Sequence, residues 1–510
     1  MAGQHGMVSS GHPLATLAGL EVLRSGGSAV DAAIAAGTTS CVVLPHACGV
    51  GGDIFAVGYD AAGARLWAIN GSGKAPQAAT LAHFPHGMRE DEIASSTIPG
   101  AVHGWAEMCA RYGRKRLPEL LAAAERWAAE GFLVDPTLAM LVAANDAKLR
   151  KHPTTAQVFT SGDGSLKPGD VLRQPDLART LRRIASSPED FYRGEVASRL
   201  AHSVAQQGGL FASADLAAHA SRWEEPIATN YHGYSIYVSP PNSIGILLLV
   251  QLALLDADAL TRMGHNSAAY IKELIGAKRA AFAHVLPLLC DPDALPVSVS
   301  TILSQEFIRN LRRAPVAMAG REVADTTAII AADADGNVVT LIQSLYFHFG
   351  CGVVAGDTGV MLNNRMMGFS TMPGSPNVVT GGRRPAHTLT PTVVMRDTLP
   401  ALAIATPGAF AQTQSLCQLL NNILVFGLEL QQAIEAPRWF DDVDNSTLIE
   451  KRISPETIAD LESPGYDVKV GSDWEAKTGN VQAIKIEHTA KGRILYGAAD
   501  LRRNGLALGW

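Results

Sequence analysis

Two adjacent hydroxyl residues, Thr326 and Thr327, open an apolar segment at residues 323–330, "VADTTAII". Threonine is common in strands, but packing alone does not call for two hydroxyls at the start of a buried one. A threonine hydroxyl is a weak nucleophile and needs a base within hydrogen-bond reach. The chain has no G-x-S-x-G motif, and none of its 15 histidines has a position that identifies it as that base.

Cleavage of the chain between Asp325 and Thr326 would supply the base without any second residue. The new α-amine would belong to the same residue as the hydroxyl, and its reference pKa of about 8 suits a general base near neutral pH. Thr326 is therefore a candidate N-terminal nucleophile, and the Asp325–Thr326 bond is a candidate cleavage site.

The segments after Thr326 are predicted to be mainly strands. Residues 326–345 fit two strands joined by a turn at 333–337, where Gly336 permits a positive φ. One helix, "TQSLCQLLNNILVFG", is expected among further strand-like segments, which are "GVMLNN", "TPTVVMRD", "ALAIATPG", "VQAIKIEH" and "RILYGAA".

The part of the chain before Thr326 is predicted to be mostly helical. A first helix is expected from about Pro13 to the "SGG" of 25–27, and Ser28 with Asp31 predicts a capping box for the next helix. Apolar residues recur at helical spacing through about 105–290. The glycine-rich "HACGVGGDIF" leads from a helix into a strand, which is the wrong order for a dinucleotide-binding motif. Together the two parts predict a central sheet covered by helices.

Composition and charge argue against several classes of protein. With 510 residues, 47% hydrophobic and 18% charged, the chain is typical of a globular protein. A net charge of −6 and the absence of a basic run argue against nucleic acid as a partner. The longest apolar run, 244–255, is too short to cross a membrane and contains Gln251, so a buried helix is expected. No signal-peptide pattern is visible, so the expected compartment is the cytoplasm.

Cysteine usage indicates free thiols and no metal site. The six cysteines are scattered along the chain. Cys41, His46 and Cys48 lie close together, but no second Cys/His pair has ligand spacing. Neither a metal nor another cofactor is expected.

Several motifs, taken in their order along the chain, resemble the gamma-glutamyltransferase family of self-processing N-terminal-nucleophile hydrolases. They include "MVSSGHPLATLAGLEVLRSGGSAVDAAIAA", "PHACGVGGDIF", "TIPGAVHGW", "DTTAIIAADADGNVVTLIQSL", "GVMLNNRM", "ATPGAF" and "YGAADLRR". The resemblance implies a four-layer αββα sandwich and autocatalytic cleavage into a helix-rich large subunit, 1–325, and a strand-rich small subunit, 326–510. A homodimer of such heterodimers is left open.

The resemblance also implies roles for five catalytic residues. Thr326 matches the nucleophile, and Thr327 and Ser344 match hydroxyls that support it. Gly408 and Ala409 match a glycine pair whose N–H groups form the oxyanion hole. Alanine keeps the N–H but leaves less room.

The sequence departs from the family where relatives hold a γ-glutamyl group. Ser72 stands where an arginine usually meets the α-carboxylate, and Gly368 stands where an acid usually meets the α-amine. The other departures among candidate substrate-binding residues are Tyr346 for an asparagine, Arg365 beside Asn364 for Gln or Glu, and His387 and Thr388 for a serine pair. A buried ammonium without its carboxylate costs several kcal/mol, so we expect poor glutathione hydrolase activity.

The departures favour a different acyl group. Arg365, Lys74 and His387 are candidate cationic or donor groups for a carboxylate-bearing acyl part without an α-amine, although Arg365 and Lys74 could also be exposed surface charges. Oxamate amidohydrolases and cephalosporin acylases are family members with comparable departures. A short loop after "NNRMMGF" favours an open site.

Three functions stay open at this point. The leading hypothesis is an amidohydrolase that cleaves a small carboxylate-bearing amide through Thr326, with no cofactor. The second is a true glutathione hydrolase or gamma-glutamyltransferase that holds its substrate differently. The third is an unprocessed, inactive relative that acts as a binding protein, which the retained hydroxyls argue against.

Overall fold

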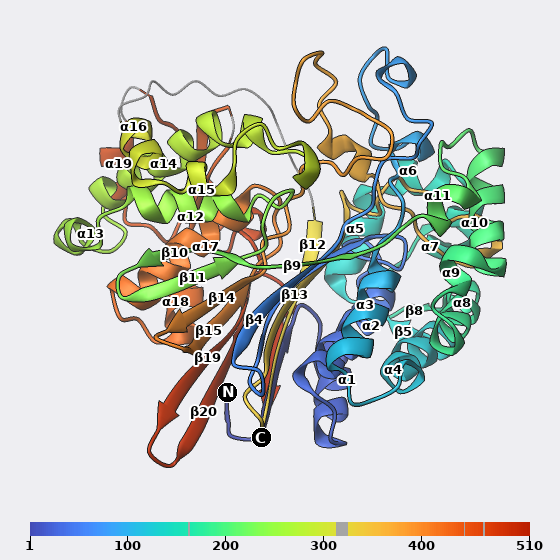
Figure 1. Cartoon of the computed structure of the whole chain (residues 1–510), viewed down its shortest axis with the longest axis horizontal. Coiled ribbons are helices and arrows are strands. Elements are labelled where there is room, and N and C mark those ends of the chain that lie inside the picture. The colour runs from blue at the N-terminus through green and yellow to red at the C-terminus, as the bar shows by residue number, and fades with distance from the viewer. Residues whose placement is uncertain (162–163, 313–324, 443, 463–464) are drawn as a thin grey trace.

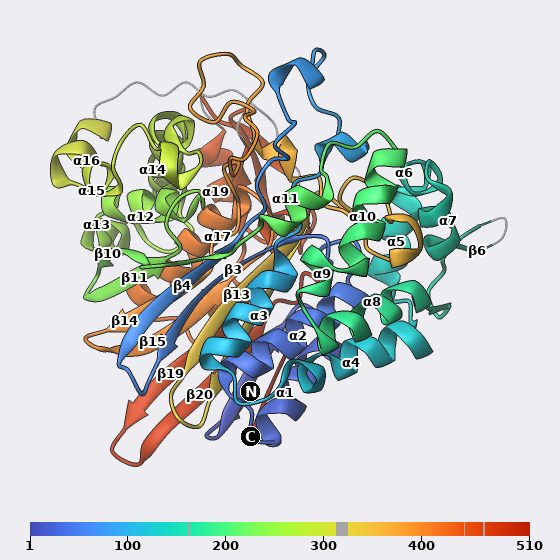
Figure 2. The same cartoon turned by 45° about the vertical axis from the view of Figure 1, so that its right-hand side comes forward.

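Four layers make up the molecule: a sheet covered by helices stacks on a second sheet covered by helices (Figures 1 and 2). A computed structural model describes residues 1–161, 164–312, 325–442, 444–462 and 465–510. This is the αββα arrangement that the sequence motifs implied.

Each of the two large sheets has seven strands among the described residues, and all neighbouring strands in them are antiparallel. The first sheet has the order β1 (Ala2–Gly3), β20 (Gly492–Ala499), β19 (Gln482–Thr489), β15 (Leu399–Ala405), β14 (Thr392–Arg396), β11 (Tyr234–Val238) and β10 (Ile227–Tyr231). The second has the order β21 (Leu506–Gly509), β2 (Gly6–Ser10), β12 (Asp325–Asp333), β13 (Val338–Tyr346), β3 (Asp53–Asp60), β4 (Arg65–Gly71) and β9 (Arg222–Glu224).

Alternating side chains of the strands build two cores at once. On β12, Ala328 and Ile330 belong to the core between the sheets, whereas Ile329 and Ala331 belong to the core under the helices. This period of two is the normal consequence of strand geometry. β12 lies between β2 and β13, so both of its edges are paired.

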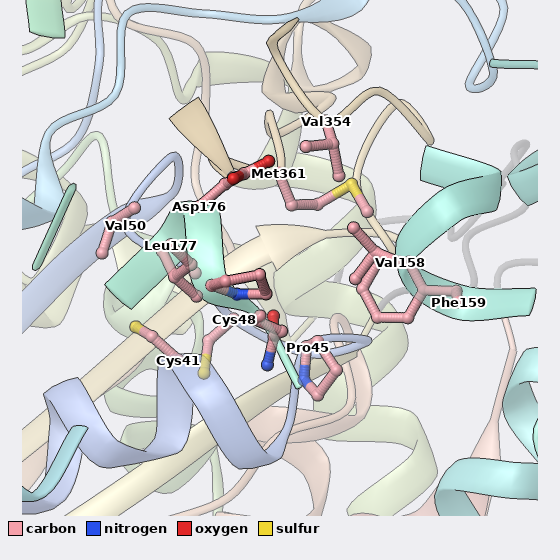
Figure 3. A pocket seen from close by; sticks show the side chains of 14 residues that line it. Cys41, Pro45, Cys48, Val50, Val158, Phe159, Asp176, Leu177, Val354 and Met361 are labelled. Carbon is pink, nitrogen blue, oxygen red and sulfur yellow. The ribbon is translucent and has the colours of Figure 1, made fainter. Parts of the chain in front are cut away.

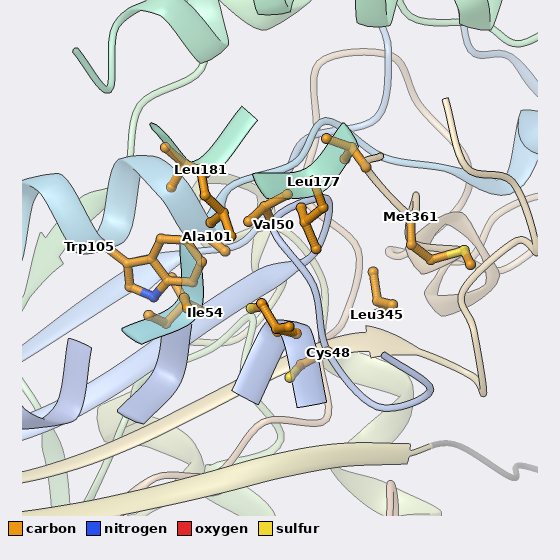
Figure 4. Packing of buried hydrophobic residues seen from close by; sticks show 14 of the residues in the cluster. Cys48, Val50, Ile54, Ala101, Trp105, Leu177, Leu181, Leu345 and Met361 are labelled. Carbon is orange, nitrogen blue, oxygen red and sulfur yellow. The ribbon is translucent and has the colours of Figure 1, made fainter. Parts of the chain in front are cut away.

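The helices on the second sheet come from the first part of the chain. They are α1 (Pro13–Arg24), α2 (Ala29–Val43), α3 (Ala101–Tyr112), α4 (Leu117–Glu130), α5 (Pro136–Ala144), α6 (Asp146–Arg150), α7 (Pro153–Phe159), α8 (Pro175–Ser186), α9 (Asp190–Arg193), α10 (Glu195–Gln206) and α11 (Ser213–Ala217). Figure 4 shows Trp105 of α3 beside Ile54 of β3, and both are fully buried. Such contacts fix the helices on the sheet through apolar burial.

The helices on the first sheet come from the middle and the end of the chain. They are α12 (Gly245–Leu254), α13 (Ala257–Met263), α14 (Ala268–His284), α15 (Val299–Ile302), α16 (Gln305–Leu311), α17 (Ala411–Leu420), α18 (Leu430–Glu435) and α19 (Pro455–Leu461). Smaller pairings join β16 (Trp439–Asp441), β17 (Ser446–Ile449) and β18 (Asp467–Val470), β5 (Phe132–Leu133) with β8 (Val171–Leu172), and β6 (Thr160–Ser161) with β7 (Gly164–Ser165). Within the described part of the chain, no helix has the length and apolarity needed to cross a membrane.

Several local predictions are confirmed. α1 begins at Pro13, and Ser28 and Asp31 form the capping box at the start of α2. Gly336 has a φ of 102° in the turn between β12 and β13. The apolar run at 244–255 forms the buried α12.

Two predictions are wrong in part. The segment "GVMLNN" at 359–364 forms isolated bridges and no strand. Asn363 explains this, because its side chain bonds the backbone of Gly51 and Thr97 in place of a strand neighbour. The strand expected after the glycine-rich loop is β3, but the same part of the chain also supplies β2 and β4 to the second sheet, which were not expected.

Candidate active site

Thr326 lies at the start of β12, a strand of the second sheet that is paired along both edges. It is 2% exposed, and its Oγ1 donates a hydrogen bond to Ser344 Oγ on β13 at 3.2 Å. The register of the two strands shifts between Asp325 and Thr327, so Thr326 stands at a β-bulge. A bulge commonly redirects a side chain next to an active site. In the intact chain the nitrogen of Thr326 is still the amide of Asp325, so the α-amine base appears only after cleavage.

Ser344 connects the nucleophile to the turn that follows β13. Its Oγ accepts the N–H of Tyr346 at 2.8 Å, while it also receives the Thr326 hydroxyl. Tyr346 has a φ of 84°, a left-handed conformation that costs a non-glycine residue roughly 1–2 kcal/mol. Strain of this kind gathers at functional sites because the surroundings have to hold it in place.

The turn between β15 and α17 has the geometry of an anion site. Gly408 and Ala409 have φ values of 120° and 49°. Within the described part of the chain, neither N–H donates a hydrogen bond. Both precede the first turn of α17, where the helix dipole favours negative charge. Ala409 packs against Tyr346 in one buried cluster, so this turn borders the nucleophile's end of the sheet.

Thr327 is also buried, but it lies apart from this hydrogen-bond chain. Its Oγ1 has no hydrogen-bond partner among the described residues. A Cβ placed on Gly11 would lie 3.0 Å from that oxygen, so glycine leaves room for the hydroxyl. The structure therefore gives Thr327 a position beside the nucleophile and no contact that shows its role.

A buried carboxylate joins two predicted substrate-binding residues. Asp53 Oδ2 accepts Arg365 Nε and lies 3.1 Å from both that atom and His387 Nε2. Its Oδ1 accepts the N–H of Gly73 at 2.8 Å. The Arg365 guanidinium also lies over the Tyr346 ring, 3.9 Å from the centroid. Asp53, Arg365 and His387 are all fully buried.

Burial decides between the alternatives that the sequence left open for two residues of this cluster. Arg365 is not an exposed surface charge, because its side chain has no exposed area. His387 is not cationic at neutral pH, because burial, together with the charge of Arg365, lowers the pKa of its imidazole to about 4. For Asp53, burial alone would raise the pKa, but the hydrogen bond from His387, the charge of Arg365 and the N–H of Gly73 outweigh burial and lower the pKa.

Asp53 was not among the residues predicted from the sequence. Its signal was an acid directly after the "GVGG" loop, at the first position of a fully buried strand. Acids are almost never fully buried without a partner. That position could therefore have been expected to require a buried cation.

Three other predicted substrate-binding residues are buried, and two of them have hydrogen bonds that hold the local structure. Ser72 is fully buried, and its Oγ donates to Asn70 Oδ1 at 2.7 Å. Asn364 Oδ1 accepts the N–H of Phe347 at 3.1 Å, which holds the turn after β13. Thr388 Oγ1 is buried without a hydrogen-bond partner among the described residues.

Lys74 is more exposed than the other predicted site residues, and Gly368 has no room for a side chain. Lys74 is half-buried, and its carbonyl accepts the N–H of Ile98 at 3.1 Å. A Cβ on Gly368 would lie 2.8 Å from the Ala386 carbonyl oxygen, closer than real Cβ contacts allow. No side chain fits at position 368 unless the backbone moves.

A separate cavity lies between the end of α2, the glycine-rich loop and the start of α8 (Figure 3). Cys41, Cys48, Val158 and Leu177 are among its lining residues, and none of the predicted site residues lines it. All six cysteines are free thiols, as expected. No group of three or more potential metal ligands occurs among the residues that the structure describes.

Comparison with known proteins assigns the family. Residues 15–510 match the model of the gamma-glutamyltranspeptidase family. A glutathione hydrolase-like YwrD proenzyme of Bacillus subtilis is 33% identical, with 99% of this chain and 98% of that protein covered. An oxamate amidohydrolase proenzyme of Klebsiella pneumoniae is 33% identical with the same coverage. The solved structure of a cephalosporin acylase from Bacillus halodurans has a TM-score of 0.91 and 31% identity over 100% of this chain and 96% of that one. The chain belongs to the gamma-glutamyltranspeptidase family, and it is an enzyme of the N-terminal-nucleophile type.

Proposed function

We propose that the chain cleaves itself between Asp325 and Thr326 and then hydrolyses a small carboxylate-bearing amide. The observation that carries this proposal is the Thr326 hydroxyl, buried at the start of a central strand and hydrogen-bonded to Ser344. Cleavage gives the subunits 1–325 and 326–510. The family's proenzymes support this order of events.

The geometry supports a two-step reaction. The free α-amine of Thr326 takes the hydroxyl proton while Oγ1 attacks the amide carbonyl. The N–H groups of Gly408 and Ala409 are suited to stabilise the oxyanion that forms. The carbon–nitrogen bond then breaks, the leaving amine takes the proton, and an ester to Thr326 remains. Water attacks that ester in the same way and releases the acid and the free enzyme.

The acyl pocket argues against a γ-glutamyl group. Gly368 has no space for the acid that would meet an α-ammonium. Asp53 does not replace that acid, because its two oxygens already serve Gly73, Arg365 and His387. Displacing those donors to bind an ammonium would leave Arg365 as a buried charge without this partner, which is costly.

Relatives of this chain carry the names of three kinds of amide-cleaving enzyme. An oxamate amidohydrolase and an acylase are similar to this chain over almost its full length, and so are glutathione hydrolases. Arg365, Tyr346 and Lys74 are the groups we propose to face the carboxylate-bearing part of the acyl group. Ser72, Asn364 and His387 support the walls of that pocket through their hydrogen bonds, and Thr388 is a buried wall residue.

The test compares substrates on one processed preparation. We first confirm two chains by denatured intact mass, and then measure ammonia release from oxamate and p-nitroaniline release from γ-glutamyl-p-nitroanilide. The proposal expects faster turnover of oxamate. Faster turnover of the γ-glutamyl anilide would establish the glutathione hydrolase alternative, and an uncleaved chain inert to both would favour a binding protein.

A further inference from the structure

One buried carboxylate, that of Asp53, lies between an arginine and a histidine beside the proposed acyl pocket. Asp53 Oδ2 is 3.1 Å from both Arg365 Nε and His387 Nε2. The side chains of all three residues have no exposed area. Charges buried in this way are screened weakly, so they act on a neighbouring ligand over several ångströms.

The hydrogen bonds define which of these groups is charged. His387 Nδ1 accepts the N–H of Leu389 at 3.4 Å, so the proton of the neutral ring is on Nε2, facing Asp53. The imidazole thus donates to Asp53 without adding a charge. Within this pair, the positive charge of Arg365 and the negative charge of Asp53 offset each other.

The ion pair is held directly beside the nucleophile's strands. Asp53 is the residue of β3 opposite Ser344, which holds the Thr326 hydroxyl. Arg365 covers the Tyr346 ring, and Tyr346 is the residue of β13 opposite Asp325. The pair therefore borders the place where the acyl group lies if Thr326 attacks it.

We propose that Asp53 is a specificity-determining residue that sets the charge selectivity of the acyl pocket by cancelling the charge of Arg365. This inference rests on the proposed function, because it concerns the same acyl group. Hydrolysis of a carboxylate-bearing amide adds a second carboxylate to the product. With the Asp53 charge removed, the pocket would hold that product more tightly relative to the substrate than it does with the charge in place. Asp53 thus keeps affinity for a monoanion moderate and eases release of the dianion.

The experiment uses two probes that differ in charge and little in shape: oxamate, an anion, and oxamide, its neutral amide. Dissociation constants for both are measured by calorimetry on four processed proteins, and kcat/KM is measured wherever turnover occurs. The proteins are the wild type, Asp53→Asn, Arg365→Gln and the double variant. Denatured intact mass confirms that each is cleaved into two chains.

The expected selectivity for oxamate over oxamide follows the net charge of the pair. Relative to the wild type, it rises about tenfold in Asp53→Asn and falls about tenfold in Arg365→Gln, where Asp53 is left uncancelled. The double variant carries no charge on the pair, as in the wild type, and should stay within about threefold of it. Oxalate, the dianionic product, should bind Asp53→Asn most tightly.

The double variant decides between this inference and its rival. If Arg365 alone recognises the carboxylate and Asp53 only holds it in place, the double variant loses as much selectivity as Arg365→Gln, and the inference is overturned. Removing both charges of a buried pair is usually tolerated, whereas removing one is not. The double variant therefore remains informative even where a single variant fails to fold.

Failure of the proposed function would give a different result. The wild-type enzyme would then turn over neither oxamate nor oxamide, but the binding selectivities of the four proteins, measured by calorimetry, would still test the inference. If neither the wild type nor Asp53→Asn binds oxamate, the inference is overturned as well, because removing the Asp53 charge should strengthen the binding of a small anion.

Discussion

The region around Thr326 and the region around Arg365 are joined by adjacent strands, yet they are built from different groups. The first uses hydroxyls and backbone N–H groups: Thr326, Ser344 and the turn at Gly408. The second uses buried charge, with Asp53 between Arg365 and His387. Substituting a neutral group of the first region should cost little stability. Substituting a buried charge of the second region should change both substrate selectivity and stability. The comparison predicts that changes in the first region affect chemistry, and that changes in the second affect stability and selectivity.

The largest effect is expected from Thr326→Ala, which tests the first half of the comparison. Without the hydroxyl neither self-cleavage nor amide hydrolysis can occur, so activity should vanish and the chain should stay whole at 53.8 kDa. Thr326→Ser keeps a hydroxyl and should still be cleaved. Denatured intact mass and ammonia release measure both outcomes. Cleavage of the alanine variant would remove Thr326 from its assigned role.

The next largest effect is a loss of stability when a charge in the second region is removed. Arg365→Leu leaves the Asp53 carboxylate buried without its cation, which should cost about 3–5 kcal/mol of unfolding free energy. The matched control is Arg396→Leu at the exposed end of β14, which should change stability by less than about 0.5 kcal/mol. Thermal midpoints of the two variants provide the measurement. Equal midpoints would show that the buried pair contributes nothing beyond a surface charge.

A third effect is a dependence of stability on pH that belongs to the second region alone. The pKa of His387 is about 4 in the folded protein because of burial and the Arg365 charge, against about 6.5 in the unfolded chain. Between these values the unfolded chain binds a proton that the folded protein does not. Stability therefore falls as pH drops from about 6.5 to about 4, by up to roughly 3 kcal/mol. The lowered pKa of Asp53 adds a loss at still lower pH.

The measurement compares wild type with His387→Gln, which keeps a side-chain donor but does not titrate. The thermal midpoint of the wild type should fall more between about pH 7 and about pH 4.5. Other buried histidines, such as His12 and His219, are present in both proteins and cancel in the difference. Parallel pH curves would show that His387 does not titrate in this range.

The smallest effect is expected at the turn formed by Gly408 and Ala409. It tests whether changes in the first region affect chemistry or stability. Ala409 has a φ of 49°, so Ala409→Gly removes left-handed strain and should stabilise the protein by about 1 kcal/mol. The N–H remains, so turnover should change by less than about threefold. Chemical denaturation and steady-state kinetics measure the two quantities. A large loss of activity would mean that the methyl group packed on Tyr346 positions the hole.

The first region could be predicted from the sequence because its signals are local. The turn at Gly336 and the capping box of α2 each depend on neighbours within a few residues. The residues alone predicted a central sheet covered by helices, and the family resemblance implied the αββα fold class. Local chemistry of this kind leaves a pattern in the chain itself.

The second region could not be predicted because its partners are far apart in the chain. Asp53 and Arg365 are separated by 312 positions, and nothing near either residue names the other. Whether His387 is a cation or a neutral donor could not be decided from the sequence for the same reason, since its pKa depends on burial by distant elements. The segment at 359–364 was taken for a strand because apolar spacing cannot show that Asn363 bonds a loop.

The position of β12 between β2 and β13 has a consequence for the life of the mature enzyme. Before cleavage, the two halves of the second sheet find each other within one molecule. After the proposed cleavage at Asp325–Thr326, the pairs of β12 with β2 and of β13 with β3 would join two separate polypeptides and remain intact while the protein stays folded. Once unfolded, however, those polypeptides diffuse apart, and reassembly becomes a second-order process that depends on concentration. Processing therefore turns a protein that can refold into one whose lifetime is set by how slowly it unfolds.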